Sequence, residues 1–166
     1  MGWFDEALDH LQKARAAWRE IDDRWGEGWT LFHLGNTYRD LGRFDEALDH
    51  YQQALVRGRE MGAQLGEAWA LHSLGTTYRG LGRLDEALDH YQQALKVRRE
   101  MGSDRWGEGQ TLDHLGEILH RTGQSKAARA SWLQALTIFE ELRDPQAADV
   151  RARLETLNIE DPDQNP

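Results

Sequence analysis

The chain has 166 residues, of which 39% are hydrophobic, and a net charge of -9. No apolar run approaches the roughly 20 residues of a membrane-spanning helix, and the negative charge opposes binding to the phosphate backbone of nucleic acid. The absence of cysteine excludes disulfides and thiolate chemistry. Because no charged and then apolar leader is present, we expect a cytoplasmic protein.

The sequence repeats itself almost without change. Residues 42–55 recur at 82–95 with Phe44 replaced by Leu84, at a spacing of 40 residues. Self-similarity at a period of about 20 to 50 residues is typical of stacked supersecondary units, and each unit buries its apolar face against its neighbours. We therefore expect a single all-α array that forms one domain.

Apolar residues at helical spacing predict the helices of this array. In chain order we expect them at 4–22, 27–41, 44–61, 66–81, 84–101, 107–122, 125–142 and 145–157. Those at 27–41, 66–81 and 107–122 are called A helices here, and those at 4–22, 44–61, 84–101 and 125–142 are called B helices. The array then spans residues 1–158, with a truncated first repeat at 2–22, full repeats at 25–62, 65–102 and 106–143, a capping helix at 145–158 and a disordered tail at 159–166.

Two sets of glycines recur at the repeat spacing. Gly42, Gly82 and Gly123 follow the A helices, as expected of residues that end a helix in a left-handed conformation. A second set lies inside the A helices, where glycine costs about 1 kcal/mol relative to alanine. We interpret this second set as points of close helix approach, with small B-helix residues as the matching surface. The glycines are Gly35, Gly75 and Gly116, and the small residues are Ala14, Ala47, Ala54, Ala87, Ala94, Ala128 and Ala135.

Several positions of each unit resemble the signature of the tetratricopeptide repeat. They are Leu34, Gly35, Tyr38, Ala47, Tyr51 and Ala54, repeated as Leu74, Gly75, Tyr78, Ala87, Tyr91 and Ala94. The resemblance implies a right-handed superhelical solenoid of antiparallel helix pairs, with about three and a half repeats and a C-terminal capping helix. The spacing of 40 exceeds the family's 34, and Arg59 and Arg99 stand where the family has a closing proline. The longer units are similar to those of kinesin light chains and of the C-terminal arrays of actinobacterial signal-transduction ATPases and regulators.

The resemblance also implies a concave groove lined by the A helices, which holds a protein or peptide segment. Tryptophan and arginine often dominate interface energies, and both occur at the matching positions, so a partner with an apolar anchor and acidic neighbours is expected. The chaperone-tail clamp of some family members is not reproduced, because Phe32 and His72 replace its lysines. The expected groove residues are Trp29, Phe32, His33, Asn36, Arg39, Trp69, His72, Thr76, Arg79, Gln110, Asp113, Glu117, His120 and Arg121.

Structural roles compete with binding for these residues. Trp29 and Trp69 are equally consistent with core packing between A helices. For a further aromatic and aliphatic set near the A-helix starts, core packing is the favoured interpretation. Arg39 and Arg79 have the alternative of surface ion pairs with carboxylates such as Asp40 or Glu86. The set favoured as core consists of Trp25, Leu65 and Trp106.

Enzymatic and metal chemistry have little support. His10, His50 and His90 share one register, but helices about 8–10 Å apart do not bring them to the roughly 2 Å of a zinc–nitrogen bond. Asp113 and two neighbours at helical spacing share a face without an identifiable second helix to complete a site, and no serine has the context of a nucleophile. We predict a non-enzyme without metal or cofactor.

The alternative function is structural. The chain reads as part of a longer array, because its first unit has a B helix and no A helix. Leu8, Leu11 and Trp18 of that helix would then leave an apolar patch, which soluble monomers rarely tolerate. A scaffold, or a homo-oligomer formed through the truncated N-terminal end, is therefore the second hypothesis.

Overall fold

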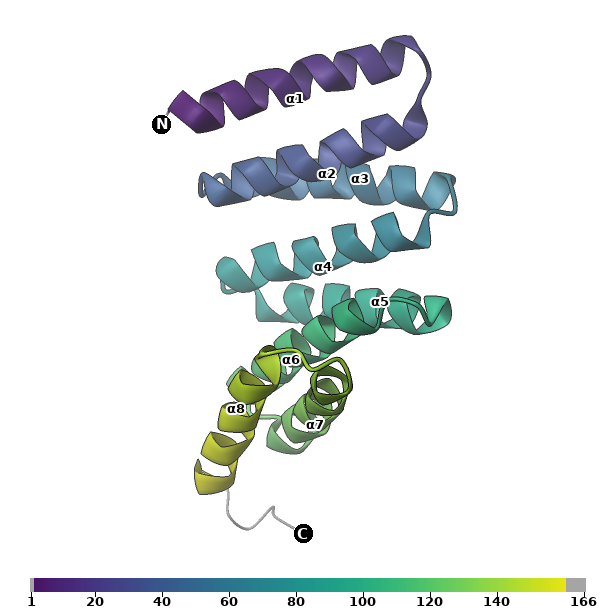
Figure 1. The fold of residues 1–166 in the computed structure, drawn as a ribbon. Helices are drawn as coiled ribbons and strands as arrows, with labels where there is room; N and C mark the ends of the chain where they lie inside the picture. The colour runs from purple at the N-terminus through teal and green to yellow at the C-terminus, as the bar shows by residue number, and fades with distance from the viewer. Residues whose placement is uncertain (1, 161–166) are drawn as a thin grey trace.

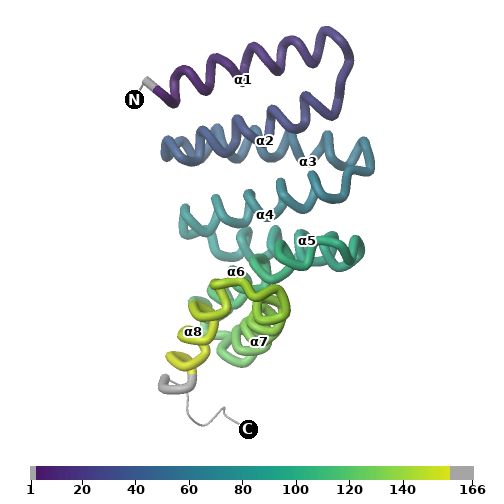
Figure 2. Tube along the Cα trace, viewed as in Figure 1, coloured from purple at the N-terminus to yellow at the C-terminus, as the bar shows by residue number. Residues whose placement is uncertain are grey.

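The computed structural model describes residues 2–160, which form a solenoid of eight helices stacked from one end to the other (Figure 1). No strand occurs in this part of the chain. The tube in Figure 2 follows the same path, with α1 and α8 at opposite ends of the stack. The helices are α1 (Gly2–Glu20), α2 (Arg24–Asp40), α3 (Phe44–Glu60), α4 (Gln64–Gly80), α5 (Leu84–Met101), α6 (Arg105–Arg121), α7 (Ser125–Glu141) and α8 (Gln146–Glu160).

Each helix packs mainly on its neighbours in sequence. The pairs α2 with α3, α4 with α5 and α6 with α7 are the repeats, and α1 packs on α2. The A helices also touch each other in succession, α2 on α4 and α4 on α6. The predicted all-α solenoid of antiparallel helix pairs is confirmed, and α8 packs against α7 at its end.

The A helices begin two or three residues before their predicted starts. The cause at two of them is an aspartate N-cap. The Asp23 carboxylate accepts a hydrogen bond of 2.9 Å from the amide of Gly26, and Asp104 accepts one of 3.1 Å from Gly107. The second A helix, α4, begins after Ala63, which supplies no side-chain cap.

The C-terminal boundary also differs from the prediction. Helix α8 continues to Glu160, so Ile159 and Glu160 are helical and do not belong to a disordered tail. Val150, Leu154 and Leu157 are buried on its inner face, as expected of a helix that covers the end of a core. Residues 161–166 of the predicted tail lie outside the described part of the chain.

The glycines after the A helices have the predicted left-handed backbone. Their φ angles are 72° at Gly42, 73° at Gly82 and 76° at Gly123. Residues other than glycine are strained at such positive φ angles. The turns from A helix to B helix therefore depend on these three residues.

The glycines inside the A helices are close-packed as predicted, but their partners are aromatic rings and not alanines. A Cβ added to Gly35 would lie 2.6 Å from the ring of Tyr51, and one on Gly75 would lie 2.9 Å from Tyr91. Gly116 receives Trp132 in the same way. A helix face without a Cβ offers a flat hollow, and a planar ring fills it more completely than a methyl group can.

An ion pair recurs where one repeat meets the next. Arg59 lies 2.7 Å from Glu67, and Arg99 lies 3.0 Å from Glu108. Between α1 and α2 the equivalent pair is Arg19 and Glu27, which lie 3.7 Å apart. The arginines found in place of the family's proline thus link each B helix to the following A helix. The arginine side chains are about half exposed, so each pair contributes about 0–1 kcal/mol.

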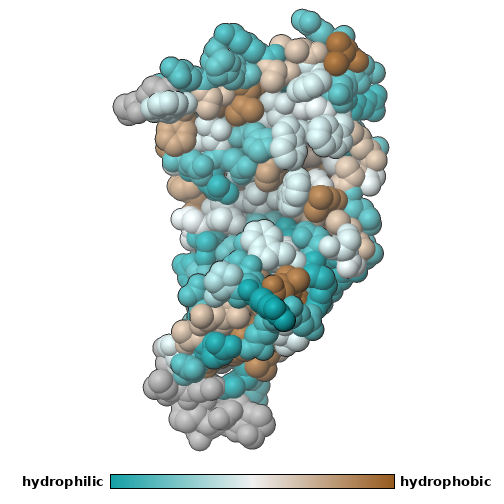
Figure 3. Space-filling model, in the orientation of Figure 1, coloured by the Kyte–Doolittle hydropathy of each residue, from teal (hydrophilic) through white to brown (hydrophobic). Residues whose placement is uncertain are grey.

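The surface is mixed in character. On the face shown in Figure 3, hydrophobic side chains lie in small separate patches among hydrophilic ones. No helix among residues 2–160 combines the length and the apolar character of a membrane span.

Candidate functional site

The predicted groove tryptophans form part of an aromatic wall that runs from α2 to α4. The ring centroids of Trp29 and Trp69 are 6.0 Å apart, and Phe32 lies 5.9 Å from Trp69. His33 packs edge-on against Trp29 at 4.4 Å. Trp29 is 43% exposed and Trp69 is half-buried. The rings therefore pack on one another and still present one side to solvent.

The prediction that Trp25, Leu65 and Trp106 form core is wrong. Their side chains are 64%, 39% and 47% exposed. They lie in the first turn of each A helix and face outward there; Trp25 stacks on Trp29 at 5.8 Å, and the Trp106 indole donates a hydrogen bond of 2.9 Å to Asp144. Helical spacing alone does not separate the buried side of an A helix from its open side.

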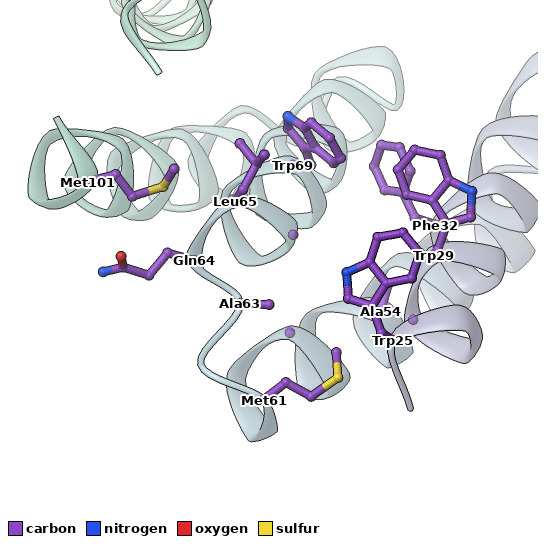
Figure 4. A pocket seen from close by; sticks show the side chains of 13 residues that line it. Trp25, Trp29, Phe32, Ala54, Met61, Ala63, Gln64, Leu65, Trp69 and Met101 are labelled. Atoms are coloured by element: carbon purple, nitrogen blue, oxygen red, sulfur yellow. The ribbon is translucent and has the colours of Figure 1, made fainter. Parts of the chain in front are cut away.

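The aromatic wall borders a pocket of about 410 Å³ between α2, α3 and α4 (Figure 4). In the close-up, the side chains of Trp25, Trp29 and Trp69 surround one side of it, while Met61 and Met101 lie at the ends of α3 and α5. Its lining carries no charged residue. The lining residues are Trp25, Gly28, Trp29, Phe32, Ala54, Gly58, Met61, Ala63, Gln64, Leu65, Gly66, Trp69 and Met101.

The second repeat lacks a large side chain at one edge of the pocket. The position equivalent to Gly58 in the first B helix is Trp18. Its ring fills the space that a Cβ on Gly26 would occupy. The equivalent residue in the third B helix is Arg98, whose guanidinium fills the space that a Cβ on Gly107 would occupy. In the second repeat both facing positions are glycine, and no atom lies within 4 Å of a Cβ built on Gly66. A Cβ built on Gly58 would instead lie 3.1 Å from the backbone nitrogen of Glu67, so α3 and α4 meet backbone to backbone here, and the open space lies on the other side of Gly66.

The open space beside Gly66 gives a direct stability prediction. Gly66→Ala should raise the free energy of unfolding by up to about 1 kcal/mol, because alanine favours the helix and its methyl group enters open space. The matched change Gly26→Ala should lower it by about 1–3 kcal/mol, because the methyl group meets Trp18. Urea unfolding of both variants measures the difference. Equal shifts would show that the two sites are equally open.

The C-terminal half of the predicted groove is closed. Asp113, expected to line it, is buried and its carboxylate accepts hydrogen bonds from Arg153 of α8. Glu117 pairs with Arg79, so Arg79 does not pair with Glu86. The capping helix therefore occupies the place where a ligand would meet Asp113, and arginines pair with both carboxylates of this face.

Between the two halves lies a cluster of polar rings. His72 Nδ1 is 3.1 Å from the hydroxyl of Thr111, and Thr76 is 3.0 Å from the hydroxyl of Tyr91. Burial lowers the pKa of His114 to about 4, and burial also holds the pKa of His72 well below its usual value. Both imidazoles are neutral at pH 7, so this part of the face carries no histidine charge.

The remaining predicted residues are spread along the same face. Asn36 accepts a hydrogen bond of 2.7 Å from Tyr51, and Arg39 pairs with Asp40 at 3.0 Å. Gln110 and His120 are half-buried, whereas Arg121 is exposed. Of the predicted residues, Trp29, Phe32 and Trp69 line the pocket, whereas Arg79 of α4 contacts Glu117 of α6.

The histidines that share one register pack on tyrosines. His50 stacks on Tyr38 and His90 packs on Tyr78, each at 5.1 Å. The predicted apolar patch on the first B helix is wrong, because Leu8 is buried and Leu11 packs on the same core. Trp18, the third residue of that patch, covers Gly26.

A curated protein shares part of this sequence. "Regulatory protein AfsR" of Streptomyces griseus is 39% identical over 54 residues, a match that covers 32% of this chain and 6% of AfsR. The chain therefore corresponds to a small part of the length of this relative.

Solved structures share the fold at low identity. BtubC (BKLC) of P. vanneervenii has a TM-score of 0.79 at 22% identity, over 95% of this chain and 66% of that one. The apo form of RapI has a TM-score of 0.89 at 14% identity, over 98% and 45%. A Rap protein complexed with Competence and Sporulation Factor has a TM-score of 0.77 at 19% identity, over 96% and 45%.

Sequence models of one family cover most of the chain. Two matches described as "Tetratricopeptide repeat" span residues 1–60 and 56–100, and a third with the same description spans 109–140. These ranges contain most of each helix pair and the glycine-and-ring contacts described above. The chain belongs to the tetratricopeptide repeat family.

Proposed function

We propose that the chain is a non-catalytic module that binds a protein or peptide segment on the open face of α2 and α4. The observation that carries this proposal is the uncharged pocket of about 410 Å³ beside the aromatic wall, which Trp29, Phe32 and Trp69 line. Large aromatic side chains at the edge of a pocket are typical anchors of protein interfaces. The family consists of helical repeat modules that bind proteins, and one structural relative is described in complex with a factor.

The polar residues of the predicted groove support a boundary for this interface. Arg39, Asn36 and Thr76 lie along the same face, and beyond them Arg153 of α8 covers Asp113. We infer that a ligand contacts the N-terminal half of the face, so Gln110, Asp113, Glu117, His120 and Arg121 contribute less than predicted. We further propose that the module is a sensor or regulatory part of a larger bacterial cytoplasmic protein, which the partial match to AfsR supports.

The first test is partner capture with altered tryptophans. Protein captured from a bacterial lysate by the wild type should fall at least about tenfold with the double variant Trp29→Ala, Trp69→Ala, because each truncation of such an anchor typically costs about 2 kcal/mol. The matched control is Trp106→Ala, which removes an equally exposed indole from the third repeat. Circular dichroism should show that all three proteins are folded.

Two outcomes would contradict the proposal. Equal capture by the wild type and the double variant would place the interface elsewhere. A loss with Trp106→Ala as large as the loss with the double variant would show that any exposed indole suffices.

The alternative of a scaffold or self-association module has a different observation in its favour. Trp3 is 86% exposed and Phe4 is 38% exposed at the start of α1. Light scattering at high protein concentration separates the two functions. A concentration-dependent dimer that disappears with Trp3→Ser would favour self-association, and a monomer would count against it.

A further inference from the structure

One edge of the solenoid carries an apolar side chain at each of the first three turns from a B helix to an A helix. Figure 1 shows the turns α1–α2 and α3–α4 at the same edge of the stack. Ile21 is 68% exposed in the first turn, and methionines occupy the equivalent positions of the next two. With the exposed first-turn residues of α2 and α4 they form what we call the apolar edge. Its residues are Ile21, Trp25, Met61, Leu65 and Met101.

The apolar edge is continuous with the pocket, because every residue of the edge except Ile21 lines it. The third A helix differs in its first turn. There the Trp106 indole donates a hydrogen bond to Asp144, and Arg105 pairs with Glu141 at 3.0 Å. These polar contacts mark the end of the edge at α6.

A row of carboxylates accompanies the apolar edge. The last turns of α1, α3 and α5 place the exposed residues Glu20, Glu60 and Glu100 directly before the apolar residues. Glu60 lies 2.9 Å from Arg57, whereas within residues 2–160 neither of the other two glutamates has a cationic partner. Glutamate at the C-terminal end of a helix opposes the helix dipole. Helix stability therefore does not explain the row.

The cations of this part of the molecule do not favour an acidic partner. Arg39 and Arg79, which favoured one in the sequence, pair with carboxylates of the array itself. Arg24, in the first turn of α2, lies 3.9 Å from Asp22. The glutamates at the B-helix ends are the charges that a partner can complement, and they call for lysine or arginine.

The spacing of the apolar edge matches that of an α-helix. The A helices α2 and α4 touch, and packed helices lie about 8–10 Å apart. Seven residues of a helix rise about 10.5 Å, at about 1.5 Å per residue. A helix that crosses the starts of the A helices therefore meets one repeat with each heptad, and apolar residues seven positions apart reach successive parts of the edge.

We propose that the apolar edge binds a basic amphipathic α-helix of a protein partner, which lies across the starts of α2 and α4. Its apolar face contacts the edge and the pocket, and its lysine or arginine residues lie beside Glu20, Glu60 and Glu100. Such helices in apolar grooves are a recurrent form of recognition, and the net charge of -9 attracts a cationic segment. The inference rests on the proposed function and names the kind of segment that is bound.

The probe is a fluorescently labelled peptide of three heptads, with leucine at the first and fourth positions of each heptad and lysine elsewhere. Its control has the same composition with the leucines at alternate positions, so they cannot share one face of a helix. Fluorescence anisotropy should show saturable binding of the heptad peptide and binding of the control that is at least about tenfold weaker. Equal binding of the two peptides would overturn the proposal.

Two triple variants remove the same charge from opposite ends of the B helices. Loss of the edge carboxylates should weaken binding of the heptad peptide about tenfold. The control should have little effect at about 0.1 M salt, because a helix length of about 25 Å exceeds the Debye length of about 10 Å. Equal losses would show that only overall charge attracts the peptide. The variants are Glu20→Gln, Glu60→Gln, Glu100→Gln at the edge and Asp5→Asn, Asp45→Asn, Asp85→Asn at the first turns.

Ile21→Ser separates this inference from the function on which it rests, because Ile21 belongs to the edge and does not line the pocket. The variant should bind the heptad peptide about tenfold more weakly. If its peptide binding is unchanged while Trp29→Ala, Trp69→Ala loses the captured protein, the binding face stands and the helix site is wrong. If Ile21→Ser weakens the peptide while the double variant still captures protein, the edge stands and the proposed function fails.

A second copy of the chain and a membrane are the other occupants to be tested. A dimer in light scattering that disappears with Ile21→Ser would assign the edge to self-association. Sedimentation with phosphatidylglycerol vesicles that is lost in the same variant would assign it to a membrane surface. Either result would overturn the proposal, and we expect neither, because the glutamate row repels both a second copy of itself and an anionic bilayer.

Discussion

Replacing Tyr91 with alanine should lower the free energy of unfolding by about 3–5 kcal/mol. The ring is completely buried in the hollow of Gly75 and contacts His72 and His114. Because Gly75 has no side chain that could move into the space, the cavity cannot collapse easily. Urea unfolding followed by circular dichroism measures the loss, and the transition should also become less cooperative as the third repeat uncouples from its neighbours.

The control for this prediction is Tyr91→Phe, which keeps the ring and removes the hydroxyl. That hydroxyl lies 3.0 Å from Thr76, so its removal should cost only about 1 kcal/mol. A loss with phenylalanine as large as that with alanine would show that the hydrogen bond, and not the fit of ring to glycine, holds the repeat together.

The protein should lose stability on acidification over the range in which histidine titrates in an unfolded chain. The pKa of His114 is about 4 in the folded protein because of burial, against an ordinary value of 6.5. Between these values the unfolded chain binds more protons, so the free energy of unfolding falls as the pH falls and its full value is present only above pH 6.5. By pH 4 this residue alone should remove about 3 kcal/mol. The lowered pKa of His72 acts in the same direction.

His114→Gln isolates this contribution from those of other titrating groups. The variant should lose less stability than the wild type between pH 7 and pH 4, by about 3 kcal/mol. Unfolding curves at several pH values provide the measurement. Parallel pH profiles of the two proteins would show that His114 is protonated without penalty in the folded state.

The features that could be predicted from the sequence are those that recur. Gly42 and Gly82 each follow an A helix. Gly35 recurs as Gly75 inside an A helix, where glycine is unfavourable unless another group packs closely against it. Which ring fills the hollow was not predictable from spacing, because Tyr51 carries the same helical periodicity as its alanine neighbours. The fold was therefore predictable, and its contacts were predictable only in part.

The features of the site that sequence reasoning missed are those that break the repeat. Gly58 replaces Trp18 and Arg98, and this departure in an otherwise repeated register was the available signal for the pocket. The burial of Asp113 had no such signal, because its partner Arg153 lies on a helix outside the repeat pattern. Exposed tryptophans such as Trp25 were predicted to be core because a hydrophobic side chain does not by itself indicate which side of a helix packs against its neighbours.

The same arginine and glutamate pair links each B helix to the next A helix, so the array can lose or gain one complete repeat of 40 residues and keep its packing. If residues 44–83 were removed, Arg43 would be followed by Leu84, and Gly35 would face Tyr91 in place of the identical Tyr51. Glu27 and Glu108 would keep Arg19 and Arg99 as partners, so the shortened chain would form the same solenoid with one repeat fewer. It would nevertheless remove Gly58, Ala63 and Gly66 together. Loss or gain of this single unit would thus remove or restore the pocket without any change to the contacts by which the solenoid is assembled.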